Sequence, residues 1–158
     1  MVILDLFRSV LDEAPVAIVV TDAVVERPGP TILYANTAFG RLTGRAPCDV
    51  IGLTPRFMHG RDTRRAVLDQ FAIALKACER FHGFLTNYRA DGSRYVVEID
   101  CRPLTDTSGR LTNFIAFERE VVRRRGRPAV GASGRFEPVE ESHDSLTTIL
   151  PGMNLFKS

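Results

Sequence analysis

Three polar side chains within one short segment, residues 52–60, could bind a small molecule. The segment reads GLTPRFMHG and places the Thr54 hydroxyl, the Arg56 guanidinium and the His59 imidazole between two glycines. A guanidinium is a good ligand for phosphate or carboxylate, and a hydroxyl can donate or accept a hydrogen bond. The simpler interpretation makes Arg56 a surface partner of an acidic neighbour and His59 a partly exposed loop residue. No cysteine or second histidine lies at ligand spacing, so a metal site is not expected.

A carboxylate near the end of the chain's last long strand pattern is another candidate. In residues 111–122, strand alternation places Phe114, Ala116 and Glu118 on one face and the intervening residues on the other. If the first face is buried, Glu118 points inward and can pair with Thr54, His59 or a cationic ligand. If the strand end frays, Glu118 is solvated. The sequence contains no Ser–His–Asp spacing, Gly-rich phosphate loop or legible carboxylate pair, so no enzyme is expected.

The composition is typical of one globular domain with a tail. The chain has 158 residues, 44% of them hydrophobic and 25% charged, with a formal net charge of +2. This charge is too small to favour nucleic acid or a membrane as a partner. No apolar run reaches about 18 residues. The three cysteines, Cys48, Cys78 and Cys101, lack paired spacing. They favour a reducing compartment, and we expect the protein to be cytoplasmic.

Hydrophobic periodicity predicts an α+β fold. Three helices are expected. The first covers residues 3–14, the second lies between an Asn36 cap and Gly44, and the third covers residues 62–79 with Asp62 as its cap. Strands are expected over residues 16–21, 32–34, 84–88, 95–104 and 111–122, with hairpin turns at 90–93 and 106–109. The order indicates a five-stranded antiparallel sheet with short helices on one face.

The two ends of the chain differ from its middle. Residues 1–15 are expected to form a flanking helix with one apolar face, and residues 16–122 the domain itself. Residues 123–158 begin with Arg123, Arg124, Arg125 and Arg127 and contain few large apolar side chains before the last dozen. They are interpreted as a linker and a largely flexible tail whose end could dock onto the domain or a partner.

Four signatures over roughly residues 12–122 resemble the PAS family, specifically its light-oxygen-voltage (LOV) branch. Residues 52–60 resemble the flavin-binding motif Gly-x-Asn-Cys-Arg-Phe-Leu-Gln-Gly. The other three are residues 33–44 (LYANTAFGRLTG), 81–92 (FHGFLTNYRADG, similar to the family's NYRKDG hairpin) and 114–116 (FIA). The resemblance implies a PAS fold with a ligand pocket.

The same resemblance implies an altered flavin site. Pro55 stands where the family has its photoreactive cysteine, so the cysteine–flavin adduct cannot form there. Arg56 and Asn87 are retained, whereas other positions differ: Thr54 replaces an asparagine, His59 a glutamine, Val97 a second asparagine, Glu118 the glutamine of the final strand, and Ala72 a phosphate-binding arginine. Each lost hydrogen bond to a buried polar ring costs about 1–3 kcal/mol. A tightly bound flavin is therefore not expected, but a loosely bound or different ligand stays open.

These features predict a non-enzymatic sensory or signalling module. We expect it to relay the state of its pocket to a partner protein through the flanking helix and the sheet, and to form a homodimer. One alternative is a photo- or redox sensor that holds FMN or FAD without a covalent bond. Another is a ligand-free PAS interaction scaffold, in which Val97, Ile99, Cys101 and Ala116 are simply core residues.

Overall fold

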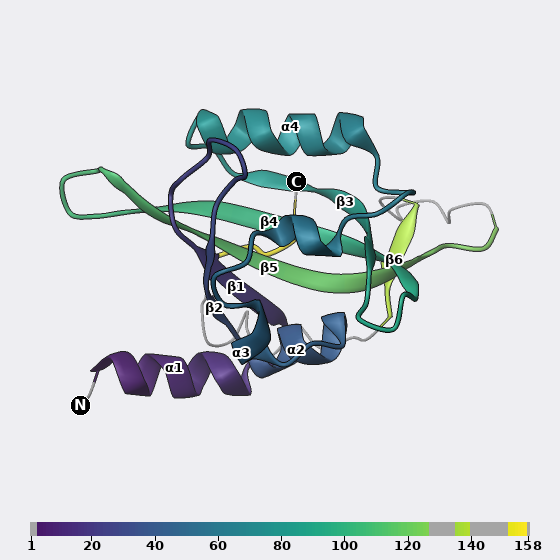
Figure 1. Cartoon of the computed structure of the whole chain (residues 1–158), viewed down its shortest axis with the longest axis horizontal. Coiled ribbons are helices and arrows are strands. Elements are labelled where there is room, and N and C mark those ends of the chain that lie inside the picture. The colour runs from purple at the N-terminus through teal and green to yellow at the C-terminus, as the bar shows by residue number, and fades with distance from the viewer. Residues whose placement is uncertain (1–2, 127–134, 140–151, 158) are drawn as a thin grey trace.

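The predicted antiparallel sheet is present, with one additional short strand. The computed structural model describes residues 3–126, 135–139 and 152–157. In this part of the chain the strand order is β2-β1-β5-β4-β3, and β6 pairs with β5 beyond that path (Figure 1). The strands are β1 (Ala17–Thr21), β2 (Ile32–Ala35), β3 (Phe81–Tyr88), β4 (Arg94–Thr105), β5 (Leu111–Arg123) and β6 (Phe136–Pro138). The α+β architecture predicted from periodicity is confirmed.

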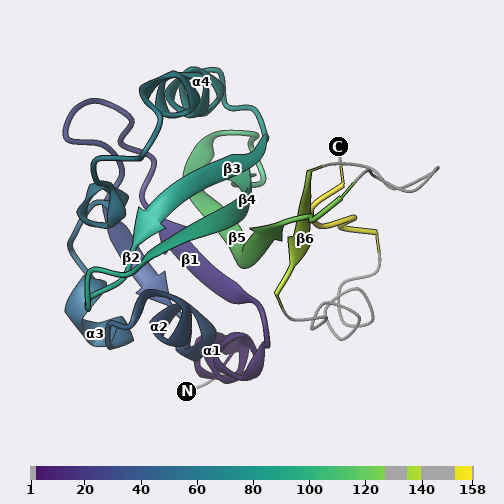
Figure 2. The ribbon, with the colours of Figure 1, turned by 90° about the vertical axis from the view of Figure 1, so that its right-hand side faces the viewer.

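Helices cover one face of this sheet, which we call the inner face. They are α2 (Thr37–Thr43), α3 (Pro47–Val50), the 3-10 helix η1 (Pro55–Met58) and α4 (Arg65–Lys76). Figure 2 shows them on one side of the curved sheet, with the C-terminal segment on the other side, the outer face. The helix α1 (Ile3–Glu13) precedes β1 and lies beside α2.

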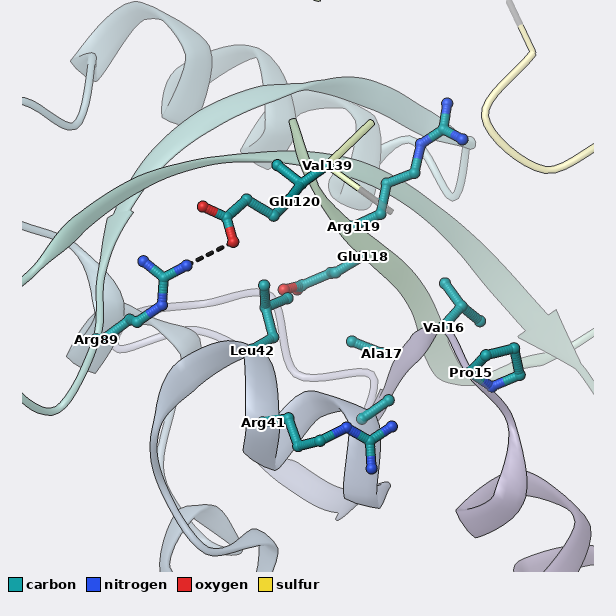
Figure 3. A pocket seen from close by; sticks show the side chains of 11 residues that line it. Pro15, Val16, Ala17, Arg41, Leu42, Arg89, Glu118, Arg119, Glu120 and Val139 are labelled. Atoms are coloured by element: carbon teal, nitrogen blue, oxygen red, sulfur yellow. Dashed lines mark hydrogen bonds and ion pairs between the residues drawn. The ribbon is translucent and has the colours of Figure 1, made fainter. Parts of the chain in front are cut away.

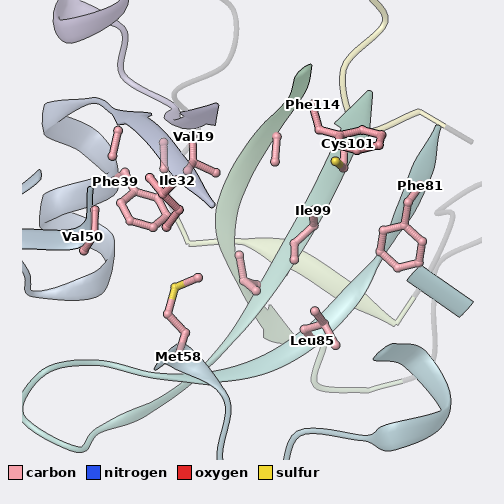
Figure 4. Close-up of a cluster of buried hydrophobic side chains, with 14 of the residues drawn as sticks. Val19, Ile32, Phe39, Val50, Met58, Phe81, Leu85, Ile99, Cys101 and Phe114 are labelled. Carbon is pink, nitrogen blue, oxygen red and sulfur yellow. The ribbon is translucent and has the colours of Figure 1, made fainter. Parts of the chain in front are cut away.

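The main hydrophobic core fills the space between the inner face and the helices. Side chains alternate along a strand, so every second residue of β4, from Tyr95 to Cys101, enters this core. Phe39 of α2 and Val50 of α3 face them from the helical side, and Ile32 of β2 joins the same core (Figure 4). A smaller cluster on the outer face joins Val16, Ile18 and Phe117 to Leu155 and Phe156 near the C-terminus.

The predicted cap of α2 is confirmed and also joins three elements. The Asn36 side-chain oxygen accepts hydrogen bonds from the amides of Ile18 at 2.9 Å and Phe39 at 3.0 Å. Its side-chain nitrogen donates to the carbonyls of Leu11 and Val16, both at 2.9 Å. The helix ends at Gly44, whose φ of 70° suits a residue without a side chain.

The predicted cap of α4 is wrong. This helix begins at Arg65, and Arg64 occupies the cap position without a side-chain hydrogen bond. The Asp62 carboxylate instead forms an ion pair with the Arg94 guanidinium at 2.7 Å. A side chain three residues before the helix is too early to reach its free amides, so the carboxylate joins the segment before α4 to the start of β4.

The segment expected to be a linker and tail contributes to the sheet where it is described. Strand β5 continues to Arg123, and β6 pairs with it through Val121↔Pro138 and Arg123↔Phe136. Residues 152–157 pack on the outer face. The rest of the expected flexible tail lies outside the described residues. Among the helices that the structure describes, none is long and apolar enough to cross a membrane.

Candidate functional site

A cavity of about 50 Å³ lies between the inner face and the segment that joins η1 to α4. We call it the inner cavity. Alternation along the strands brings one polar residue of β3, Asn87, and one of β5, Glu118, into its wall. The remaining lining is mostly apolar and includes Met58, Phe71, Leu75, Leu85, Ile99, Cys101 and Phe114.

Two buried acceptor atoms in this wall have no hydrogen-bond partner among the described residues. They are Oδ1 of Asn87 and Oε2 of Glu118, whose residues are 1% and 4% exposed. The Asn87 amide nitrogen makes a weak contact with Met58 Sδ, at 3.9 Å, and the Asn87 side chain also hydrogen-bonds Tyr95. Buried polar groups in folded proteins are almost always hydrogen-bonded, so two orphaned acceptors in one small cavity indicate a place for a donor that the protein does not supply.

The electrostatics of the inner cavity favour neutral groups. Burial raises the pKa of Glu118 to about 7, so its carboxyl is about half protonated near neutral pH. Burial, followed by the charges of Glu118 and Asp100, raises the pKa of the Cys101 thiol to about 12. The pKa of His59 is lowered, first by burial and then by the charge of Arg56. At neutral pH the cavity thus contains a thiol and an imidazole without charge.

A larger groove of about 510 Å³ adjoins the inner cavity on the side of α4. We call it the outer groove. It lies next to the inner cavity, because the two share lining residues, namely Pro30, Pro55, His59, Phe71 and Leu75. Arg56 lines it and donates from Nε to the Pro28 carbonyl at 2.6 Å. Arg27, Arg65 and Lys76 add positive charge, although Arg65 is paired with Asp69 at 3.0 Å.

A further pocket of about 190 Å³ reaches Glu118 from the side of α2. Figure 3 shows the Glu118 side chain directed toward Leu42, beneath the ion pair between Arg89 and Glu120. Since Glu118 lines both this pocket and the inner cavity, its carboxyl lies between two separate openings.

The structure brings together four of the six site residues predicted from the sequence. His59, Asn87 and Glu118 line the inner cavity, and Arg56 joins His59 in the outer groove. Thr54 and Val97 line neither. Thr54 occupies the position before η1 without a side-chain cap bond, and Val97 is a fully buried core residue. The buried interpretation of Glu118 is thus the one that the structure adopts, although neither Thr54 nor His59 hydrogen-bonds its Oε2.

Sequence reasoning missed Met58. Its sulfur lies 3.9 Å from the Asn87 amide nitrogen and 4.0 Å from the Tyr95 hydroxyl, so it fills the space beside both polar groups. The feature of the sequence that could have identified Met58 is its position inside the segment 52–60. An apolar side chain next to candidate polar ligands often limits the volume of the site that they form.

Comparison with known proteins agrees with this arrangement. The PAS fold model matches residues 5–121. The chain is 33% identical over 117 residues to the bacterioopsin transcriptional activator of Halobacterium salinarum, covering 74% of this chain and 17% of that protein. It is 34% identical over 114 residues to phototropin-2 of Oryza sativa subsp. japonica, covering 72% and 12%. The chain therefore spans less than a fifth of the length of either relative.

A solved structure gives the same result in three dimensions. The LOV domain of the blue-light-activated histidine kinase EL346 of Erythrobacter litoralis superposes with a TM-score of 0.63 at 26% identity, covering 68% of this chain and 97% of that one. The chain belongs to the PAS family, and its similar proteins include members of the LOV branch.

Proposed function

We propose that this domain is a non-enzymatic sensory module that responds to a small molecule in the inner cavity and passes that response to a partner protein. The observation that carries the proposal is a pair of acceptors in the wall of one cavity, Asn87 Oδ1 and Glu118 Oε2, that no residue described in the structure hydrogen-bonds. A ligand that donates hydrogen bonds to both would remove the cost of leaving them buried, about 1–3 kcal/mol for each.

A flavin nucleotide held without a covalent bond is the ligand class that the site favours. The Asn87 oxygen would accept from the one N–H of an oxidised flavin ring, the protonated Glu118 carboxyl would donate to a ring nitrogen or carbonyl oxygen, and Arg56 in the outer groove is suited to the phosphate. The inner cavity alone is far smaller than the roughly 300–1,000 Å³ of typical small-molecule sites. The ring thus requires the inner cavity and the outer groove to act as one space.

The chemistry of such a group would differ from that of a LOV domain with an active cysteine. A bound flavin supplies blue-light absorption and reversible electron uptake. Pro55 has no thiol at the motif position, and the Cys101 thiol stays protonated because its pKa is raised to about 12. This chain's contribution would be to bind and orient the ring through Asn87, and to hold or release a proton at the Glu118 carboxyl.

Strand β5 is the proposed route from the cavity to the outer face. Glu118 points into the inner cavity, whereas its neighbours Phe117 and Arg119 belong to the outer face, where both contact the C-terminal segment. A ligand that shifts Glu118 together with the backbone of β5 would change the packing of these neighbours, and the outer face would then report the state of the cavity.

The test is the visible absorption spectrum of the purified protein, before and after addition of FMN or FAD and before and after blue light. The proposal predicts a flavin absorption band, either in the protein as purified or after FMN or FAD is added. Blue light should bleach this band, and the band should recover in the dark. Asn87→Leu should lose the band. A protein that takes up neither flavin, and whose melting temperature no metabolite in a screen changes, would instead be a ligand-free PAS interaction scaffold.

A further inference from the structure

The outer face carries a second binding arrangement, which is separate from the cavity. Residues Met153–Lys157 lie across β4 and β5 at the level of Asp100, in the yellow segment of Figure 2. The segment is not a strand or a helix. Asn154 and Phe156 have positive φ angles of 45° and 60°, so the main chain turns tightly over the sheet. Its position must therefore be held by side-chain contacts rather than by strand pairing.

One acidic and two basic side chains hold the main chain of this segment. Asp100 Oδ2 accepts a hydrogen bond from the Phe156 amide at 2.8 Å. Arg80 donates to the Lys157 carbonyl at 2.5 Å, and Arg102 donates to the Met153 carbonyl. All three protein groups thus recognise main-chain atoms, which any peptide possesses.

The three side chains are also paired with one another. Arg80 reaches Asp100 with two bonds at 2.9 and 2.8 Å, and Arg102 with two at 3.0 and 3.1 Å. Burial alone would raise the pKa of Asp100, but hydrogen bonds from Arg80, from Arg102 and from the Phe156 amide outweigh it and hold this pKa well below its usual range. The two arginines still neutralise Asp100 if the segment leaves, so the arrangement is preformed.

Two side chains of the segment supply selectivity. Leu155 and Phe156 are each 7% exposed and pack with Val16, Ile18 and Phe117. The Arg119 guanidinium lies over the Phe156 ring, 4.2 Å from its centre. A peptide without a large apolar pair at this place would leave that cluster uncovered.

We propose that Arg80, Asp100 and Arg102 form a peptide-binding clamp on the outer face, specific for a Leu-Phe segment whose main chain turns as residues 153–157 do. Its occupant in this structure is the chain's own residues 153–157, and the same segment of a second copy of the chain can replace them. The proposal depends only on contacts of the outer face, so it stands whether or not the inner cavity binds a ligand.

The test uses the full chain with Phe156→Ala, which weakens the internal occupant and leaves the clamp intact. An isotope-labelled sample is titrated with an unlabelled peptide that has the sequence of residues 152–158, and amide shifts are followed by NMR. We expect saturable shifts at Asp100, Arg102 and Arg119. The unsubstituted chain should bind the same peptide at least about tenfold more weakly, because its own segment competes at high effective concentration.

Two variants separate the clamp from general effects. Adding Asp100→Asn to Phe156→Ala should weaken peptide binding at least about tenfold, because it removes a charge-assisted hydrogen bond. Adding Asp69→Asn, which removes an equal charge from exposed α4, should leave binding unchanged. Melting temperatures confirm that each variant is folded. No saturable shift in the Phe156→Ala chain, or equal affinities with and without Asp100→Asn, overturns the proposal.

Discussion

Glu118 and Arg119 are consecutive residues of β5 whose side chains lie on opposite faces of the sheet. Glu118 lines the inner cavity, and Oε2 of its carboxyl has no hydrogen-bond partner among the described residues. Arg119 donates to Glu98 at 2.6 Å and lies over the Phe156 ring at 4.2 Å. A displacement of the strand at this point must therefore change both environments together.

The buried carboxyl of Glu118 should make stability fall as pH rises. Its pKa is raised to about 7 in the folded protein, from an ordinary value of 4.5. Below pH 4.5 the carboxyl is protonated in both states, so it imposes no penalty. Between these two values only the unfolded chain releases the proton, and the free energy of unfolding falls by a total on the order of 3 kcal/mol. Above the folded-state pKa the loss levels off.

Glu118→Gln isolates this effect. The amide cannot ionise, so the variant should lose this part of the pH dependence and be more stable than the unsubstituted chain at alkaline pH. Urea unfolding of both proteins, from pH about 4 to about 9, gives the difference. Parallel stability curves for the two proteins would mean that Glu118 ionises freely in the folded state.

Replacing Asn87 should separate stability from ligand binding. Asn87→Leu removes a buried oxygen that has no partner in the described part of the chain, which should raise the stability of the ligand-free protein or leave it unchanged. The same change removes a hydrogen-bonding group from the inner cavity and should abolish ligand binding. Thermal unfolding with and without FMN measures both effects. A loss of more than about 2 kcal/mol without ligand would show that Asn87 is a structural residue.

Much of the fold could be predicted because its signals are local. The turns at 90–93 and 106–109 place the three long strands, and the Asn36 cap requires only neighbouring residues. The short strand β6 pairs with a strand end and follows residues with no periodic pattern, so no local signal marks it. Asp62 resembles a helix cap in the sequence, but its contact with Arg94 is long-range.

The candidate site was only partly predictable for a similar reason. Strand alternation identifies Asn87 and Glu118 because the inner face is regular. Val97 lies on the same face but is covered by core residues, and periodicity does not distinguish a cavity wall from packed core. The hydrogen bond from the Phe156 amide to Asp100 joins residues that are 56 positions apart, so it depends on tertiary packing alone.

Asn36 should be among the most sensitive positions for stability. It is fully buried, and each of its two polar atoms makes two hydrogen bonds, which connect α1, β1 and α2. Asn36→Ala removes the helix cap and leaves buried carbonyls without donors, so it should cost on the order of 3 kcal/mol. Asn113→Ala removes one bond, to the Thr21 carbonyl at 2.9 Å, and should cost only about 1 kcal/mol. Urea unfolding of both variants compares the losses, and equal losses would contradict this account.

Helix α1 is the proposed homodimer interface. Its last turn is attached to the domain, because Asp12 accepts a hydrogen bond from the Tyr34 hydroxyl at 2.6 Å and Leu11 from Asn36. The preceding turns expose an apolar surface in which Leu4 is 83% and Phe7 62% exposed, beside Ile3, Leu6 and Val10. An apolar helical face of this extent is typical of an interaction site.

Charges placed in that surface should dissociate the dimer without unfolding the domain. Leu4→Glu together with Phe7→Glu removes two large apolar contacts, so the dimer Kd should rise at least about a hundredfold. Light scattering coupled to size exclusion, over a concentration series, measures the change. Ile73→Glu is the matched control, because Ile73 is an equally exposed apolar residue on α4, at 67%. The α1 interface is wrong if the control dissociates the dimer as strongly as the double substitution, or if the unsubstituted chain is a monomer at every concentration.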